Sequence, residues 1–129
     1  MPDKCFVLDT NAVIFLTTRG NKIPSGLEAE LNNADLFISI INEIELFSKP
    51  AMPSNEENDL RMFLSERIGI IDITGEIKVE TIKLRRNTRV KLPDCIVAAT
   101  SISLNAVLLT NDTDLLGLSW PGLLTQKII

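Results

Sequence analysis

LPDCIVAATSISLNAVLLTNDTDL, residues 92–115, is the stretch that decides the fold. It predicts a short helix with Asp94 in its first turn, a buried strand over 106–109, and a turn that carries Asp112. One acidic residue therefore opens a helix and another follows a strand. In a parallel α/β sheet, binding sites form beside the carboxyl ends of the strands, so both acids are candidates for a functional site.

The start of the chain repeats this arrangement. Residues 4–8 form an apolar run that suits a strand buried on both faces, and the run ends abruptly at Asp9. A helix is expected over 12–18, with Thr10 or Asn11 as its cap. Several carboxylates would then meet at one edge of one sheet.

The remaining chain alternates in the same way between strand and helix patterns. Further strands are expected over 36–39 and 69–73, with a short edge strand within 123–129, and further helices are expected over 27–33, 40–48, 54–67 and 75–88. Alternation of this kind predicts an α/β fold with a central, mainly parallel sheet flanked by helices. We expect one domain over residues 1–129, which is long enough for a substantial core.

Composition excludes several classes of protein. The chain has 45% apolar and 23% charged residues, two cysteines and a net charge of −4, which is typical of a globular protein without a disulfide framework. We find neither a membrane-spanning run nor a secretory pattern, and we expect a cytoplasmic protein. Histidine is absent, so acid–base chemistry would have to use carboxylates or a metal-bound water.

Each candidate acid also has an ordinary structural interpretation. Asp9 is able to cap a helix, Asp94 complements a helix dipole, and Asp112 lies in a good turn sequence. Glu43 and Glu45 flank opposite sides of the apolar stripe of one helix, and their spacing does not choose between them. Together, however, clustered carboxylates repel one another, and a hard divalent cation such as Mg²⁺ or Mn²⁺ relieves that repulsion. Such an ion activates water for attack on a phosphodiester.

Four segments resemble PIN-domain ribonucleases of the small toxin type found in bacterial VapBC toxin–antitoxin pairs. They are VLDTNAVI, FISIINEIEL, LPDCIVAAT and LLTNDTDL, starting at residues 7, 37, 92 and 108. The resemblance implies a PIN-like three-layer sandwich and an endoribonuclease that hydrolyses RNA. It also implies a small antitoxin partner that blocks the acidic edge, and a homodimer.

The resemblance also assigns roles to single residues. It implies that Mg²⁺ or Mn²⁺ is bound by Asp9, Glu45, Asp94 and Asp112. Supporting positions are Asn11, Thr110 and Asp114, with Glu43 as a surface or supporting residue. Leu115 stands where the family commonly has phenylalanine, which is a change in packing.

A basic run precedes the decisive stretch. Its residues are Lys78, Lys83, Arg85, Arg86, Arg89 and Lys91. The run suits either a solvated helix end or a surface that holds RNA phosphates, and for the second role we name Lys83, Arg85, Arg86, Arg89 and Lys91.

Two other functions remain open at this stage. One is a non-catalytic, PIN-like module that only binds a partner. The other is a phosphotransfer receiver, which the lack of a suitable mid-chain aspartate disfavours.

Overall fold

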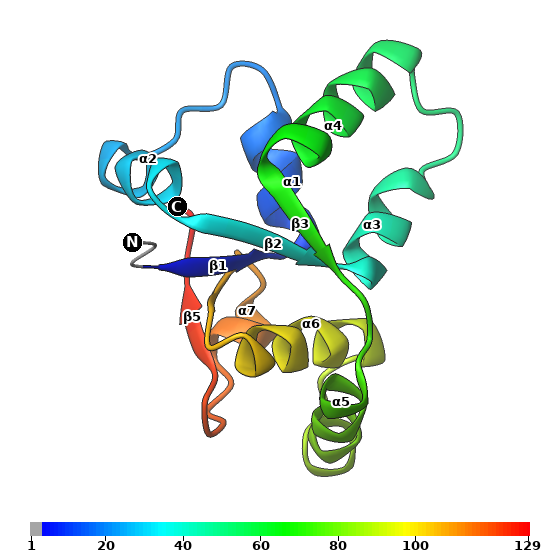
Figure 1. Ribbon diagram of the computed structural model, residues 1–129, viewed down its shortest axis with the longest axis vertical. Helices are drawn as coiled ribbons and strands as arrows, with labels where there is room; N and C mark the ends of the chain where they lie inside the picture. The colour runs from blue at the N-terminus through cyan, green and yellow to red at the C-terminus, as the bar shows by residue number, and fades with distance from the viewer. Residues whose placement is uncertain (1–3) are drawn as a thin grey trace.

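The computed structural model describes residues 4–129, and its centre is a five-stranded sheet in the order β3-β2-β1-β4-β5 (Figure 1). Every neighbouring pair of strands is parallel. The strands are β1 (Cys5–Leu8), β2 (Asp35–Ser39), β3 (Ile68–Ile71), β4 (Val107–Leu109) and β5 (Leu124–Gln126). The predicted α/β class with a mainly parallel sheet is confirmed.

Helices cover both faces of the sheet, which gives three layers (Figure 1). One layer holds α1 (Thr10–Thr17), α2 (Ser25–Asn32), α3 (Ile40–Phe47) and α4 (Ser54–Arg67). The opposite layer holds α5 (Gly75–Asn87), α6 (Leu92–Ser103) and α7 (Thr113–Leu116). None of the helices within residues 4–129 has the length and apolar character needed to span a bilayer.

The apolar first strand serves both cores, as a strand buried on two faces should. Phe6 and Leu8 pack with the α1–α4 layer, whereas Val7 packs with the α5–α7 layer. Side chains alternate across a strand, so this continuous apolar run fits only between two layers of helices. Burial of all three side chains is complete.

The structure refines three details of the sequence interpretation. Of the three capping residues that the sequence offered, Asp9 caps α1 and Thr10 and Asn11 do not, because the extended backbone of Asp9 lets its carboxylate accept a hydrogen bond from the Thr10 amide. The helix that contains Asp94, which the sequence predicts to be short, has 12 residues, Leu92–Ser103. The turn predicted at Asp112 is the start of a helix, because Asp112 caps the four-residue helix α7.

The strand order places the candidate site. The chain passes from β1 to β2 on one side, whereas β4 joins β1 on the other side. The neighbouring carboxyl ends of β1 and β4 therefore form the switch point at which parallel sheets open a crevice for ligands. The Asp9 amide donates to the Leu109 carbonyl at 3.0 Å, which holds these two strand ends together.

Candidate metal centre

Asp9 is the buried carboxylate at the centre of the candidate site. Only 5% of the residue is exposed. Its Oδ1 accepts from the Thr10 amide at 2.9 Å, and its Oδ2 accepts from Thr110 Oγ1 at 2.8 Å and from Asn11 Nδ2 at 3.2 Å. Burial raises the pKa of Asp9, and the charges of Asp112 and Glu45 raise it further, against the opposing effect of the Thr110 and Thr10 hydrogen bonds.

Thr110 and Asn11 connect the ends of β1 and β4. Besides donating to Asp9, Thr110 Oγ1 accepts from the Asp112 amide at 2.9 Å and from Asn11 Nδ2 at 3.3 Å. The other end of the Asn11 amide, Oδ1, accepts from the Asn111 amide at 3.0 Å. These two predicted supporting residues therefore do contact the acids or the turn that carries them.

Asp112 is oriented by the helix that it caps. Its Oδ1 accepts from the backbone amides of Asp114 and Leu115 at 2.8 and 3.3 Å. Asp114 therefore contributes its backbone N–H to this turn, while its side chain lies at the exposed surface. Leu115 is completely buried in the core between the sheet and the layer of α5–α7.

Asp94 lies in the first turn of α6 and is half-buried. Burial, followed by the negative charges of Asp9, Asp112 and Glu45, raises the pKa of Asp94 to about 6, and the nearby Lys91 opposes this rise. The four predicted carboxylates therefore lie within range of one another's charge, although they are distant in sequence.

The two glutamates of α3 point in different directions. Glu45 Oε1 accepts a hydrogen bond from Thr10 Oγ1 at 2.8 Å, which brings this carboxylate to the start of α1 and toward Asp9. Glu43 instead lines a separate pocket with Phe47 and Arg61. The spacing of the glutamates left the choice open, and the geometry places Glu45 with the other acids.

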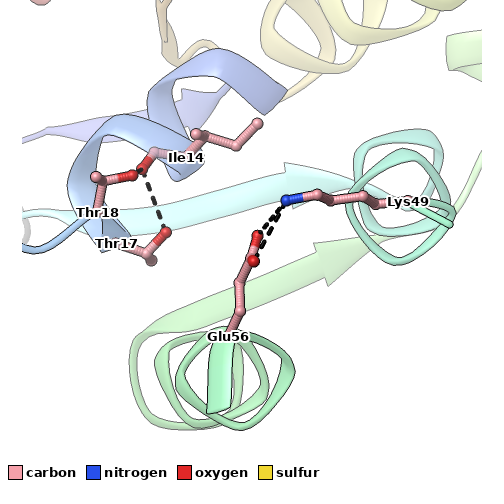
Figure 2. Close-up of polar contacts among 5 residues, drawn as sticks. All are labelled: Ile14, Thr17, Thr18, Lys49 and Glu56. Atoms are coloured by element: carbon pink, nitrogen blue, oxygen red, sulfur yellow. Dashed lines mark hydrogen bonds and ion pairs between the residues drawn. The ribbon is translucent and has the colours of Figure 1, made fainter. Parts of the chain in front are cut away.

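A groove of about 620 Å³ adjoins Glu45 and Thr10 between α1, α3 and α4. Its walls include the apolar side chains of Ile14, Leu46, Met52 and Leu60. Lys49, which follows the end of α3, and Glu56 of α4 form an ion pair at 3.0 Å (Figure 2).

The α1 wall of this groove carries two hydroxyl groups. Thr17 and Thr18 both donate to the Ile14 carbonyl, at 3.4 and 2.6 Å (Figure 2). The Ile14 carbonyl also accepts from the Thr18 backbone amide at 3.0 Å, so the two hydroxyl groups add to a carbonyl that already has a partner. The α1 wall therefore ends in a satisfied backbone beside the groove.

The residues of the basic run are all exposed, and one of them, Arg85, also has a structural hydrogen bond. Arg85 donates from Nη1 to the Val90 carbonyl at 2.8 Å, so its guanidinium holds the loop between α5 and α6. Other exposed basic residues on the same segment are Lys83, Arg86, Arg89 and Lys91. Of these, Lys91 lies close enough to Asp94 to lower its pKa.

The carboxylate oxygens of the candidate site are the donor type that a hard cation prefers, but they do not form a preformed coordination cage. Within residues 4–129, no three His, Cys, Asp or Glu side chains stand close enough to hold one metal ion together. Mg²⁺ and Mn²⁺ favour oxygen donors, and Mg²⁺ commonly keeps several waters while bound by one or two carboxylates. Carboxylates that sense one another's charge at this wider spacing fit such a hydrated ion.

Sequence reasoning missed three polar residues that build the site. Thr10 and Asn42 link α1 to α3 through a hydrogen bond at 3.1 Å. Asn111 accepts from the Ile128 amide at 3.0 Å, which ties the last strand segment to the turn before Asp112. Each of the three residues is next to a candidate acid in the sequence, and this position is the only feature that could have indicated a role in the site.

Comparisons with known proteins identify the family of this chain. The profile of the PIN domain family matches residues 6–120. No curated protein matches the chain in sequence. A toxin–antitoxin complex from Klebsiella pneumoniae contains a chain that is 33% identical, with 92% of this chain and 95% of that chain covered and a TM-score of 0.72.

Two VapBC structures are also similar. VapBC2 from Rickettsia felis, bound to a DNA fragment from their promoter, is 25% identical, with a TM-score of 0.77 and coverage of 95% of this chain and 98% of that chain. DNA-bound VapBC from Salmonella typhimurium shares the fold at 24% identity and a TM-score of 0.77, with 98% and 99% covered. The resemblance predicted from the four sequence segments is confirmed: the chain belongs to the PIN domain family.

Proposed function

We propose that this protein is a metal-dependent endoribonuclease and the toxin of a VapBC-type toxin–antitoxin pair. Membership of the PIN domain family supports a nuclease. The observation that carries the proposal is the proximity of half-buried Asp94 to Asp9, Asp112 and Glu45: burial, followed by the negative charges of these three acids, raises the pKa of Asp94 to about 6. Such mutual repulsion costs stability unless a cation offsets it, and perturbed carboxylates of this kind mark functional sites.

The four carboxylates would hold Mg²⁺ or Mn²⁺, and the bound ion would polarise a phosphate oxygen and activate water for attack. Asp9 is fixed by its hydrogen bonds to Thr110, Asn11 and the Thr10 amide. Asp94 is half-buried in the first turn of α6, so its carboxylate would reach both the bound ion and solvent.

RNA would approach along the exposed basic residues beside Asp94. Lys91 is the nearest of them, and Arg86 and Arg89 lie on the same segment. Lysine and arginine contacts to phosphates position a nucleic acid without reading its sequence. We assign this role to these exposed residues, and we assign Arg85 mainly to holding the loop.

The partner would be a small antitoxin. The similar structures from Rickettsia felis and Klebsiella pneumoniae are toxin–antitoxin complexes. The groove beside Glu45 has an apolar floor flanked by paired charges, which suits a partner's peptide segment better than a polyanion. A homodimer is also proposed, with exposed Ile73, Val79 and Ile82 as candidate contact surface.

The direct test is RNA cleavage by the purified protein with Mg²⁺ or Mn²⁺ and with EDTA. We expect cleavage with metal, loss with EDTA, and loss in Asp9→Asn and Asp94→Asn variants that remain folded by circular dichroism. Asp35→Asn is the matched control, because exposed Asp35 begins β2 at the opposite edge of the sheet. Wild-type activity in both site variants would refute the assignment.

A non-catalytic partner-binding module remains the second candidate. The groove beside Glu45 favours it, because its apolar walls suit a partner's peptide segment. It predicts tight binding of a partner with no metal-dependent cleavage of any RNA under the conditions above.

A further inference from the structure

Glu45 is a candidate metal ligand on an exposed helix surface, and among the described residues a single hydrogen bond holds its carboxylate. It is exposed on α3, and a free glutamate side chain samples many rotamers. Within residues 4–129, the side-chain hydrogen bond that the structure gives it comes from Thr10 Oγ1 at 2.8 Å. The orientation of this carboxylate toward Asp9 therefore depends on the direction in which the Thr10 hydroxyl donates.

A buried amide controls that direction. Asn42 is fully buried, and its Nδ2 donates to Thr10 Oγ1 at 3.1 Å. Its Oδ1 accepts from the Ser39 amide at 3.0 Å as part of the capping box of α3. Because a backbone N–H can only donate, Oδ1 must face Ser39 and Nδ2 must face Thr10.

This order leaves one choice for the Thr10 proton. A threonine hydroxyl has a single hydrogen to donate and lone pairs to accept. Since Asn42 donates to the oxygen, the hydrogen is free to point at Glu45 Oε1. The bonds run in one direction from Ser39 through Asn42 and Thr10 to Glu45, and each bond sets the polarity of the next.

We infer that Asn42 and Thr10 are positioning residues that hold the Glu45 carboxylate in its metal-binding orientation. The inference rests on the proposed function and deepens it. Neither residue contacts the reacting atoms; Thr10 acts on Glu45 directly, and Asn42 acts through Thr10. Supporting groups that orient a ligand typically change metal affinity about 10–100-fold when removed.

The test measures Mn²⁺ affinity of the metal-free protein by calorimetry and, in parallel, the melting temperature without metal. Thr10→Val removes the hydroxyl at nearly constant volume, and we expect it to weaken Mn²⁺ binding about tenfold. Thr10→Ser keeps a hydroxyl and should restore affinity close to that of wild type. Asn42→Ala also removes a buried cap, so its affinity loss is compared with its separate loss of melting temperature.

A double-mutant cycle separates positioning from general destabilisation. If Thr10 acts through Glu45, then Thr10→Val should weaken Mn²⁺ binding in the wild type but not in Glu45→Ala. Asn42→Ala should likewise add nothing to the affinity loss of Thr10→Val, whereas its effect on melting temperature persists. Equal losses of affinity in both backgrounds would overturn the inference.

The proposed function and this inference fail in distinguishable ways. A wild-type protein that neither binds Mn²⁺ nor cleaves RNA would overturn both. A wild-type protein that binds Mn²⁺ and cleaves RNA, together with a Thr10→Val variant of unchanged affinity, would overturn the positioning role alone.

Discussion

Thr110 Oγ1 donates a 2.8 Å hydrogen bond to Oδ2 of Asp9, although the two residues are 101 positions apart in the chain. Thr110 is fully buried directly after β4, and Asp9 is buried directly after β1. The position of the central carboxylate is therefore set by the neighbouring strand as well as by its own. Pairing of β1 with β4 thus builds the candidate site as well as the sheet.

Replacing Thr110 with valine should separate this support from the packing of the side chain. Thr110→Val keeps the volume but leaves a buried carboxylate oxygen without one donor, which costs about 1–3 kcal/mol of unfolding free energy. We expect Mn²⁺ affinity to fall about 10–100-fold. Urea unfolding and calorimetry measure the two effects. Thr110→Ser keeps the hydroxyl and is the control, and equal losses in both variants would contradict a specific role of the hydroxyl group.

Glu43 and Glu45 provide a matched pair within one helix. Glu45→Gln should lose Mn²⁺ affinity and RNA cleavage, because it removes a charge that acts on Asp9 and Asp94. Glu43→Gln should retain both, since Glu43 lines a separate pocket with Phe47 and Arg61. Single-turnover cleavage rates of the two variants decide the matter. A loss of cleavage in Glu43→Gln equal to that in Glu45→Gln would contradict the assignment of Glu45, and not Glu43, to the site.

The raised pKa of Asp94 predicts a pH dependence with a definite sign. Its pKa rises from an ordinary value of 3.8 to about 6 in the folded protein. Between these values the folded state binds more protons than the unfolded state, so without metal this residue makes the protein less stable as pH rises from about 4 to 6.

Asp94→Asn removes this titration and isolates its contribution. Relative to the wild type, the metal-free variant should gain about 1 kcal/mol of unfolding free energy as pH rises through this window, after allowance for solvent screening. Urea unfolding at pH 4, 5, 6 and 7 measures the difference. A constant difference at all four pH values would contradict the coupling of the carboxylates.

The fold was predictable because its strongest signals are local. Continuous apolar runs between helix patterns indicated a parallel sheet, and residues 5–8 and 107–109 form its two central strands in the structure. The sequence left the cap of α1 open because Asp9, Thr10 and Asn11 are all good capping residues. Only the backbone angles at Asp9 and the bond to the Thr10 amide distinguish among them.

The candidate site was predictable as a set of residue types but not as a network. Acids that follow strands or open helices are visible in the sequence, and the family resemblance chose Glu45. The contacts of Thr10 with Asn42 and Glu45 join α1 to α3 over 32 and 35 positions. Contacts over such separations depend on how the layers pack, and local patterns do not encode them.

The basic segment beside α6 makes a final prediction, in which one lysine is compared with a structural arginine and a distant lysine. Lys91 is exposed and close enough to Asp94 to affect its pKa. Lys91→Gln should therefore weaken RNA binding and reduce the slope of log affinity against log salt by about 0.7.

Exposed Lys22, which follows the far end of α1, is the control, and Lys22→Gln should leave the slope unchanged. Arg85→Ala should act differently, because its bond to the Val90 carbonyl supports the loop, and it should lower the melting temperature more than it changes the slope. Fluorescence anisotropy with a short RNA, in EDTA to prevent cleavage, measures all three variants; an unchanged slope in Lys91→Gln would exclude this segment from the RNA path.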